Sequence, residues 1–365
     1  MSTLFEPIKI GDLELKNRAV MAPLTRGRAG ESRIPNDLMA EYYGQRAGDA
    51  GLIIAEATAI SEQGYGWPGA PAMYNDDHEA GWKKTTKAVH DKGGKIFLQL
   101  WHMGRVKDES TYKEGERAVG PSAVAASQNI RRASGKAYPT PRALEKDELP
   151  GIIKDYVEGA KRAMRAGFDG VEVHAANGYL LDQFLRDGAN RRDDEFGGSI
   201  ENRIKFPLMV TKAVADAIGA GKVGIRISPT NPFNDMSDSD PKALFTAFAR
   251  ELGKLDLAYL HILEPIKKTH PFRGNDEYIT PFINEAYGGH LMVNGGYGLD
   301  DAEEALKMHK AELVAFGVPY LANPDLLARF KKRAALNEPD QATFYTGGAE
   351  GYTDYPFMAD KEEAA

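Results

Sequence analysis

The chain of 365 residues carries a formal net charge of −7, is 42% hydrophobic and 27% charged, and contains no cysteine. The cysteine count excludes disulfides, thiolate catalysis, cysteine-ligated zinc and iron–sulfur clusters. The acidic balance argues against nucleic acid or an anionic membrane as a main partner. The start, MSTLFEPIKIG, lacks a basic segment, and no stretch reaches about 18 uninterrupted apolar residues, so we expect a cytoplasmic protein without a secretory signal or a membrane span.

Residues 4–16 hold two short alternating pieces around a Gly-Asp pair, which predict a β-hairpin that forms a lid over one end of the fold. Short β-rich runs then recur, and most are followed by a helical stretch. Several of the runs are apolar on both faces, as strands buried in a parallel sheet are. The predicted strands are residues 17–25, 51–59, 95–102, 170–176, 222–230, 258–265, 290–296 and 312–319.

The segments between these runs show helical periodicity, most clearly residues 149–164 and 204–218, while 300–309 begins with the acidic residues that helix first turns favour. Eight β/α alternations predict a single (β/α)8 TIM barrel domain over residues 1–365. Residues 106–142, rich in glycine, proline and charge, predict a long excursion after the third strand, with Arg131 and Arg132 as solvated surface. The aromatic, glycine-rich residues 343–357 predict a tail packed on the barrel.

Active sites of such barrels form at the carboxyl ends of the strands. The groups found there suit a flat, polar heteroaromatic ring and a phosphate. Arg226 in a barrel strand needs an anionic or carbonyl partner, and a cofactor supplies one. Glycines at the end of the seventh strand are where barrels commonly seat a phosphate on backbone N–H groups. The strand-end residues of this kind are Pro23, Leu24, Thr25, Ala57, Gln99, Arg226, Gly295, Gly296, Gly317 and Val318.

A second group follows the fourth strand, where His174 and Asn177 stand three residues apart and Tyr179 two further on. In one helical turn or tight loop, such spacing aims two hydrogen-bond donors and a phenol at one point. They suit a substrate that carries an electron-rich oxygen and needs a proton. Taken alone, Gln99 also fits a core amide and Tyr179 a packing residue. The histidines without metal-site spacing are interpreted as structural: His102, His261, His270 and His290.

The stretch HAANGYLLDQFLRDGANRRDDEFGGSIENR, residues 174–203, resembles the old yellow enzymes, the FMN-dependent ene-reductases, in their bacterial branch of nitroester, morphinone and N-ethylmaleimide reductases. The end motif ANPDL at residues 322–326 and EGYTDYP at residues 350–356 fit the same branch. The resemblance runs from residue 4 to about residue 356. It implies bound FMN and reduction of enones, maleimides, nitroalkenes or nitrate esters by a monomer or homodimer. No G-x-G-x-x-G fingerprint is present, so NADPH or NADH is expected as a visiting hydride donor.

The resemblance also implies roles. Thr25, Gln99 and Arg226 would bond the flavin ring, with Pro23, Leu24 and Ala57 packed against it. His174 and Asn177 would hold the substrate oxygen, and Tyr179 would donate the proton. Aromatic positions around the substrate are Trp67, Trp101 and Tyr345.

One departure concerns the FMN phosphate. The family usually carries Phe-Gly-Arg at the end of the eighth strand, where this chain reads Phe316-Gly317-Val318-Pro319. The remaining donors are then backbone N–H groups around Gly295, Gly296 and Gly317. A compensating basic residue such as Arg273 is an alternative.

Two other functions compete with this reading. A flavin-free aldolase or isomerase would need a lysine or a carboxylate base at a strand end, and the carboxylates there, Glu56 and Glu172, have no lysine beside them. A non-catalytic flavin-binding or stress-response protein would not need the set formed by His174, Asn177 and Tyr179.

Overall fold

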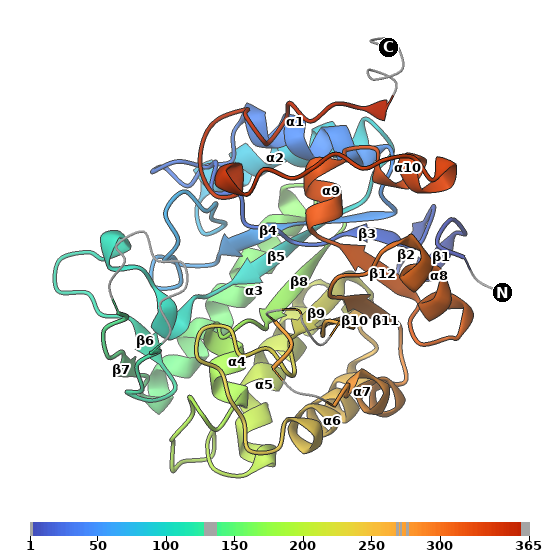
Figure 1. The fold of residues 1–365 in the computed structure, drawn as a ribbon. Coiled ribbons are helices and arrows are strands. Elements are labelled where there is room, and N and C mark those ends of the chain that lie inside the picture. Colours follow the sequence, from blue (N-terminus) through green and yellow to red (C-terminus); the bar gives the residue numbers. More distant parts are fainter. Residues whose placement is uncertain (1–2, 128–136, 268–269, 271, 275–276, 359–365) are drawn as a thin grey trace.

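In the computed structural model, eight parallel strands close into a barrel, and helices alternate with them along the chain (Figure 1). The structure describes residues 3–127, 137–267, 270, 272–274 and 277–358. Around the barrel each strand pairs with the next one in sequence, which confirms the predicted (β/α)8 architecture. The barrel strands are β3 (Ala19–Met21), β4 (Leu52–Ala59), β5 (Ile96–Trp101), β8 (Gly170–Ala175), β9 (Val223–Ile227), β10 (Tyr259–Leu263), β11 (Leu291–Asn294) and β12 (Leu313–Phe316).

Some of the helices begin at a side-chain cap. The side chains of Asn36 and Asn75 accept hydrogen bonds from the first turns of α1 and α2, and Ser199 does the same for α5. The helices are α1 (Asp37–Ala47), α2 (Asp76–His90), α3 (Leu149–Arg165), α4 (Leu180–Leu185), α5 (Ile200–Ile218), α6 (Pro241–Leu252), α7 (Thr280–Tyr287), α8 (Leu299–Lys307), α9 (Val318–Ala322) and α10 (Leu326–Lys332).

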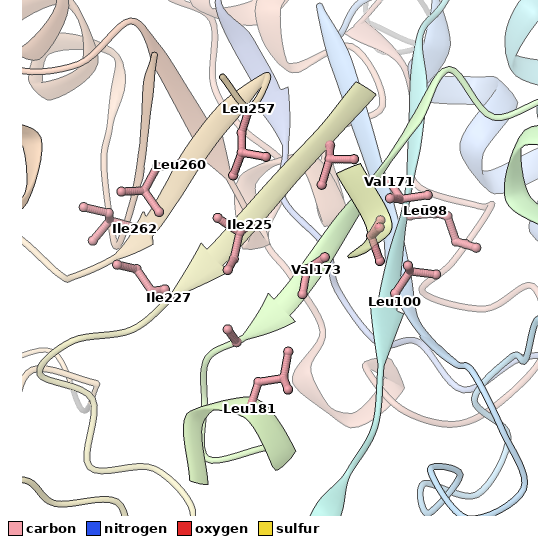
Figure 2. Packing of buried hydrophobic residues seen from close by; sticks show 14 of the residues in the cluster. Leu98, Leu100, Val171, Val173, Leu181, Ile225, Ile227, Leu257, Leu260 and Ile262 are labelled. Atoms are coloured by element: carbon pink, nitrogen blue, oxygen red, sulfur yellow. The ribbon is translucent and has the colours of Figure 1, made fainter. Parts of the chain in front are cut away.

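Side chains alternate between the two faces of the barrel strands. Figure 2 shows Leu98, Val171, Ile225 and Leu260 on neighbouring strands, and they belong to the large core cluster that also contains residues of the surrounding helices. The residues that directly follow these four on their strands point the opposite way, into the barrel interior. They are polar: Gln99 on β5, Glu172 on β8, Arg226 on β9 and His261 on β10, as is His174, which lies two positions after Glu172 on β8.

The predicted hairpin is present. Strand β1 (Ile8–Ile10) pairs antiparallel with β2 (Leu13–Leu15). Its apolar side chains pack with Leu52, Phe97 and Leu313, which stand at or near the amino ends of their strands. The hairpin therefore closes the amino end of the barrel and leaves the carboxyl end for the site.

Two further segments extend from the barrel. The excursion after β5 carries two 3₁₀ turns and a small parallel sheet of β6 (Val119–Gly120) and β7 (Arg142–Ala143). Arg131 and Arg132 lie outside the described residues. The C-terminal tail returns past α1, as the red ribbon of Figure 1 shows and as the sequence predicts. No helix in the described ranges is both long and apolar enough to cross a bilayer.

Candidate active site

A cavity of about 530 Å³ opens at the carboxyl ends of the barrel strands. Hollows of about 570 and 710 Å³ elsewhere lie among helices, away from these strand ends, so position and not size singles out this cavity. Nearly all of the residues predicted for the site line it: Pro23, Leu24, Thr25, Ala57, Trp67, Gln99, His174, Asn177, Tyr179, Arg226, Gly295, Gly296, Gly317, Val318 and Tyr345.

A hydrogen-bonded polar layer lies at the inner side of the cavity. Gln99 pairs with Glu172 in the strand register, and its Nε2 donates to Glu172 Oε1 at 2.7 Å. Glu172 Oε2 lies 2.9 Å from His261 Nδ1, and both side chains are fully buried. Because the side-chain NH₂ group of Gln99 donates to Glu172, the side-chain oxygen of Gln99 is left to accept a hydrogen bond from a ligand. Glu172 thereby orients Gln99, a role that its position in the sequence does not reveal.

Arg226 provides the positive charge of this layer. Its Nη2 donates to Asn294 Oδ1 at 2.8 Å, and Asn294 in turn donates to the Ala315 carbonyl at 2.7 Å. Burial lowers the pKa of Arg226, and the charge of Glu172 opposes that shift. The Nε atom is buried and has no partner among the described residues. The partner that a buried guanidinium needs is therefore supplied in part by Asn294, and the Arg226 side chain also lines the cavity.

His174, Asn177 and Tyr179 are brought together by a tight turn after β8. Asn177 and Gly178 have φ values of 58° and 74°, so the chain turns sharply there. The Asn177 N–H donates to Ser228 Oγ at 2.7 Å, and the Gly178 N–H donates to the buried Asp182 at 2.8 Å. The turn is thus held from both sides by hydrogen bonds.

The Asn177 side chain is oriented from the next strand-end loop. Asn231 Nδ2 donates to Asn177 Oδ1 at 2.9 Å, and Asn234 Nδ2 donates to the Asn177 carbonyl at 2.8 Å. With its oxygen occupied, Asn177 presents its NH₂ group as a donor to the cavity. Neither Asn231 nor Asn234 stands out in the sequence.

His174 is neutral in this environment. Burial, with the nearby positive charge of Arg226 and coupling to His261, holds the pKa of His174 well below its ordinary value. Its ring lies 5.0 Å from that of Tyr179, at 73°. Its Nδ1 is buried without a partner among the described residues, so Nε2 is the nitrogen that can reach the cavity.

Trp101 occupies a different place from the one that the resemblance implies. It is fully buried and does not line the cavity. Instead its ring packs edge-to-face on Tyr179, with the ring centroids 4.9 Å apart at 86°. Trp101 therefore supports Tyr179 from behind.

Aromatic side chains also stand at the mouth of the cavity. The ring centroids of Trp67 and Tyr345 lie 5.5 Å apart, and Tyr345 comes from the C-terminal tail. Arg26 and Arg28 bind carbonyl oxygens of that tail, including those of Phe344 and Gly351. Further lining residues, not expected from the sequence, come from loops and from the end of β10: Arg26, Phe233, Leu263, His270, Phe272, Tyr297 and Phe344.

These features fit FMN. The Gln99 oxygen and the Arg226 guanidinium suit the polar edge of a flavin ring, and Pro23, Leu24 and Ala57 offer a flat packing surface. Glycines at the ends of β11 and β12 line the same cavity, where barrels commonly hold a phosphate.

Comparison with known proteins agrees with this geometry. The model of the NADH:flavin oxidoreductase / NADH oxidase family matches residues 3–337. The chain is 44% identical over 365 residues to a probable flavin mononucleotide-dependent alkene reductase of Leishmania infantum, covering 98% of each chain. It is 43% identical to 12-oxophytodienoate reductase 1 of Oryza sativa subsp. japonica, covering 99% of this chain and 94% of that one.

Solved structures give the same result. The old yellow enzyme homologue from Zymomonas mobilis superposes with a TM-score of 0.93 at 44% identity, covering 97% of this chain and 99% of that one. Morphinone reductase in complex with tetrahydroNAD superposes with a TM-score of 0.91 at 48% identity, covering 98% of each chain. The chain therefore belongs to the NADH:flavin oxidoreductase family and is an oxidoreductase of the old yellow enzyme type, within the bacterial branch.

Proposed function

We propose that the protein is an NAD(P)H-dependent ene-reductase that reduces activated C=C bonds of α,β-unsaturated carbonyl and nitro compounds, and also acts on nitrate esters. The observation that carries the proposal is the wall formed by His174, Asn177 and Tyr179 in the cavity that Gln99 and Arg226 also line. FMN, held beside Gln99 and Arg226, would supply the hydride-transfer chemistry between a nicotinamide donor and the β-carbon of the substrate.

His174 and Asn177 hold the activating oxygen of the substrate. The neutral imidazole donates through Nε2 and the Asn177 amide through its NH₂ group, which Asn231 keeps directed by bonding the amide oxygen. Negative charge grows on that oxygen as the hydride reaches the β-carbon. Donors already in position stabilise the developing charge without reorganisation.

Tyr179 completes the reaction by donating its phenolic proton to the α-carbon, which yields the saturated compound. The ring is fixed between His174 and Trp101, so the hydroxyl is presented in one orientation. A general acid at this position avoids the release of a high-energy enolate into water.

The finer expectations are part of this proposal. NADPH or NADH would enter the same cavity as the substrate, each in turn, because the cavity also holds the flavin-ring residues. Enones, maleimides, nitroalkenes and nitrate esters form the proposed substrate panel. We also propose that the protein acts in the cytoplasm, as a monomer or a homodimer.

The test uses the purified full chain. It should be yellow and release FMN on denaturation. Under nitrogen, NADPH or NADH should bleach the colour, and 2-cyclohexenone or N-ethylmaleimide should restore it. A colourless protein that gains no colour with added FMN would refute the flavin assignment and revive a flavin-free barrel enzyme. Bleaching that no member of the panel reverses would leave a non-catalytic flavin-binding protein.

A further inference from the structure

The ends of β11 and β12 form a backbone cradle on one side of the cavity. Gly295 and Gly296 have φ values of 137° and 80°, which side chains rarely adopt, and with Gly317 and Val318 they line the cavity. The loops after the seventh and eighth strands of such barrels frequently bind phosphate. If FMN binds as proposed, this cradle is where its terminal phosphate would sit.

Among the described residues that line the cavity, the arginines are already bonded elsewhere. Val318 stands at the edge of the cradle, 42% exposed, and Pro319 has no backbone N–H. Arg26 also lines the cavity, but its guanidinium donates to Tyr42 and to the tail carbonyls. Arg226 is bonded to Asn294 beside Glu172.

Arg273, the alternative raised by the sequence, does not line the cavity. Its Nη1 donates to the Pro265 carbonyl, and its guanidinium lies 5.1 Å from the centre of the Tyr278 ring. Among the described residues, the candidates that remain are side chains that line the cavity.

His270 is placed to act here. It lies in the loop between β10 and α7, lines the cavity, and its Cδ2 is 3.6 Å from the position that a Cβ atom on Gly296 would take. Its Nδ1 accepts the N–H of Phe272 at 3.2 Å. With Nδ1 used as an acceptor, the neutral ring carries its proton on Nε2, the atom bonded to Cδ2. A donor thus stands beside the Gly296 backbone.

We propose that His270 donates from Nε2 to the terminal phosphate of FMN and so serves in place of an arginine at position 318. From the sequence alone, His270 was expected to be a structural residue. The inference rests on the proposed FMN-dependent function. We therefore expect the His270 side chain to recognise the phosphate of FMN and not its flavin ring.

The experiment compares FMN with riboflavin, which lacks the phosphate. Wild type and His270→Ala are loaded with either flavin and diluted, and the fluorescence of released flavin gives each dissociation constant. His270→Ala should weaken FMN by about tenfold to a hundredfold, the effect of one charge-assisted hydrogen bond, and change riboflavin by less than about twofold. Adding Val318→Arg to His270→Ala should bring FMN retention back toward wild type without affecting riboflavin.

Phe272→Leu is the matched control, because Phe272 lies in the same loop with its ring 5.5 Å from that of His270 and carries no polar side-chain atom. It should alter both flavins by the same factor. Equal weakening of FMN and riboflavin in His270→Ala would overturn the inference by showing a packing role. So would unchanged FMN release. Either result in a protein that still reduces enones leaves the proposed function standing, whereas a wild type that binds no FMN would refute the function itself.

Discussion

At the scale of single residues, Tyr179 is fixed by the rings of Trp101 and His174, which pack against it at 4.9 and 5.0 Å. Tyr179→Phe keeps these contacts and removes only the hydroxyl. We expect reduction by NADPH to stay nearly unchanged, while re-oxidation by an enone slows by about 100-fold to 10,000-fold, as is usual for loss of a general acid. Stopped-flow absorbance measures both half-reactions. An equal loss in both would remove Tyr179 from the role of acid.

Asn231 is a positioning residue: it does not line the cavity itself, and its Nδ2 donates to Asn177 Oδ1 at 2.9 Å while its Oδ1 accepts the N–H of Phe233 at 3.0 Å. Asn231→Ala frees the Asn177 amide to rotate. Phenol ligands and enones should bind several-fold more weakly, by about 0.5–1.5 kcal/mol, the usual contribution of a neutral hydrogen bond. Asn231→Asp keeps an oxygen but lacks the N–H donor, so it should not rescue binding. Phenol titrations identical in wild type and Asn231→Ala would contradict this role.

His174 links the site to the pH dependence of stability. Its folded pKa lies well below its ordinary value because of burial, so between that pKa and about 6.5 the unfolded chain binds a proton that the folded chain does not. Stability is therefore present above about pH 6.5 and falls as the solution becomes more acidic, by up to about 1.4 kcal/mol per pH unit for this group. His174→Asn should lose stability less steeply between about pH 6.5 and 5.5. Urea unfolding curves that shift in parallel for the two proteins would argue against a buried neutral His174.

At the scale of elements, the C-terminal tail completes the mouth of the cavity. It is held by backbone carbonyls bonded to Arg26 and Arg28, and by Tyr352 stacked on Tyr42 with the ring centres 4.0 Å apart. Gly27 permits this approach, because a Cβ there would come within 2.9 Å of the Tyr345 carbonyl oxygen. The position of Tyr345 thus depends on residues more than three hundred positions earlier in the chain.

Arg28→Ala removes bonds of 2.8 and 3.1 Å to the Thr343 and Phe344 carbonyls. Each charge-assisted bond contributes about 1.5–3 kcal/mol, so the tail should open at least about tenfold more often. Limited proteolysis should cut the tail sooner, and the KM for enones should rise while FMN stays bound. Lys212→Ala, which removes an exposed ion pair on α5, should change neither measurement. Proteolysis at the wild-type rate in Arg28→Ala would show that Arg26 and Tyr352 suffice.

At the scale of the whole molecule, FMN should act as a stabilising ligand, because the strand ends that line its cavity belong to the one closed barrel. At 100 times its dissociation constant FMN should add about 2.7 kcal/mol to the free energy of unfolding. Calorimetry should show one transition that moves to higher temperature with FMN and less with riboflavin at equal concentration. Two resolved transitions would contradict the prediction, untested so far, that residues 1–365 form a single domain.

Much of the fold follows from patterns within short windows. The eight strands, helix α3 and the hairpin β1–β2 were all predictable, because burial in a parallel barrel leaves apolar runs and helix faces leave 3.6-residue periodicity. The spacing of His174, Asn177 and Tyr179 was visible too, since one turn holds all three. The place of Trp101 was not, because which face of β5 meets Tyr179 depends on how the loop after β8 folds back.

The sequence by itself determined the architecture, the family and most of the cavity lining, because these depend on local periodicity and on a long contiguous motif. Only the tertiary structure decided which side chains orient others. Glu172 reaches Gln99 through strand register, and Asn231 reaches Asn177 across two loops. His270 meets Gly296 from the loop after the preceding strand. Such contacts join residues that are distant in the chain. A hydrogen bond forms only within a narrow range of donor–acceptor distance, and that distance is set by how the strands and loops pack around the closed barrel, which no local sequence pattern encodes.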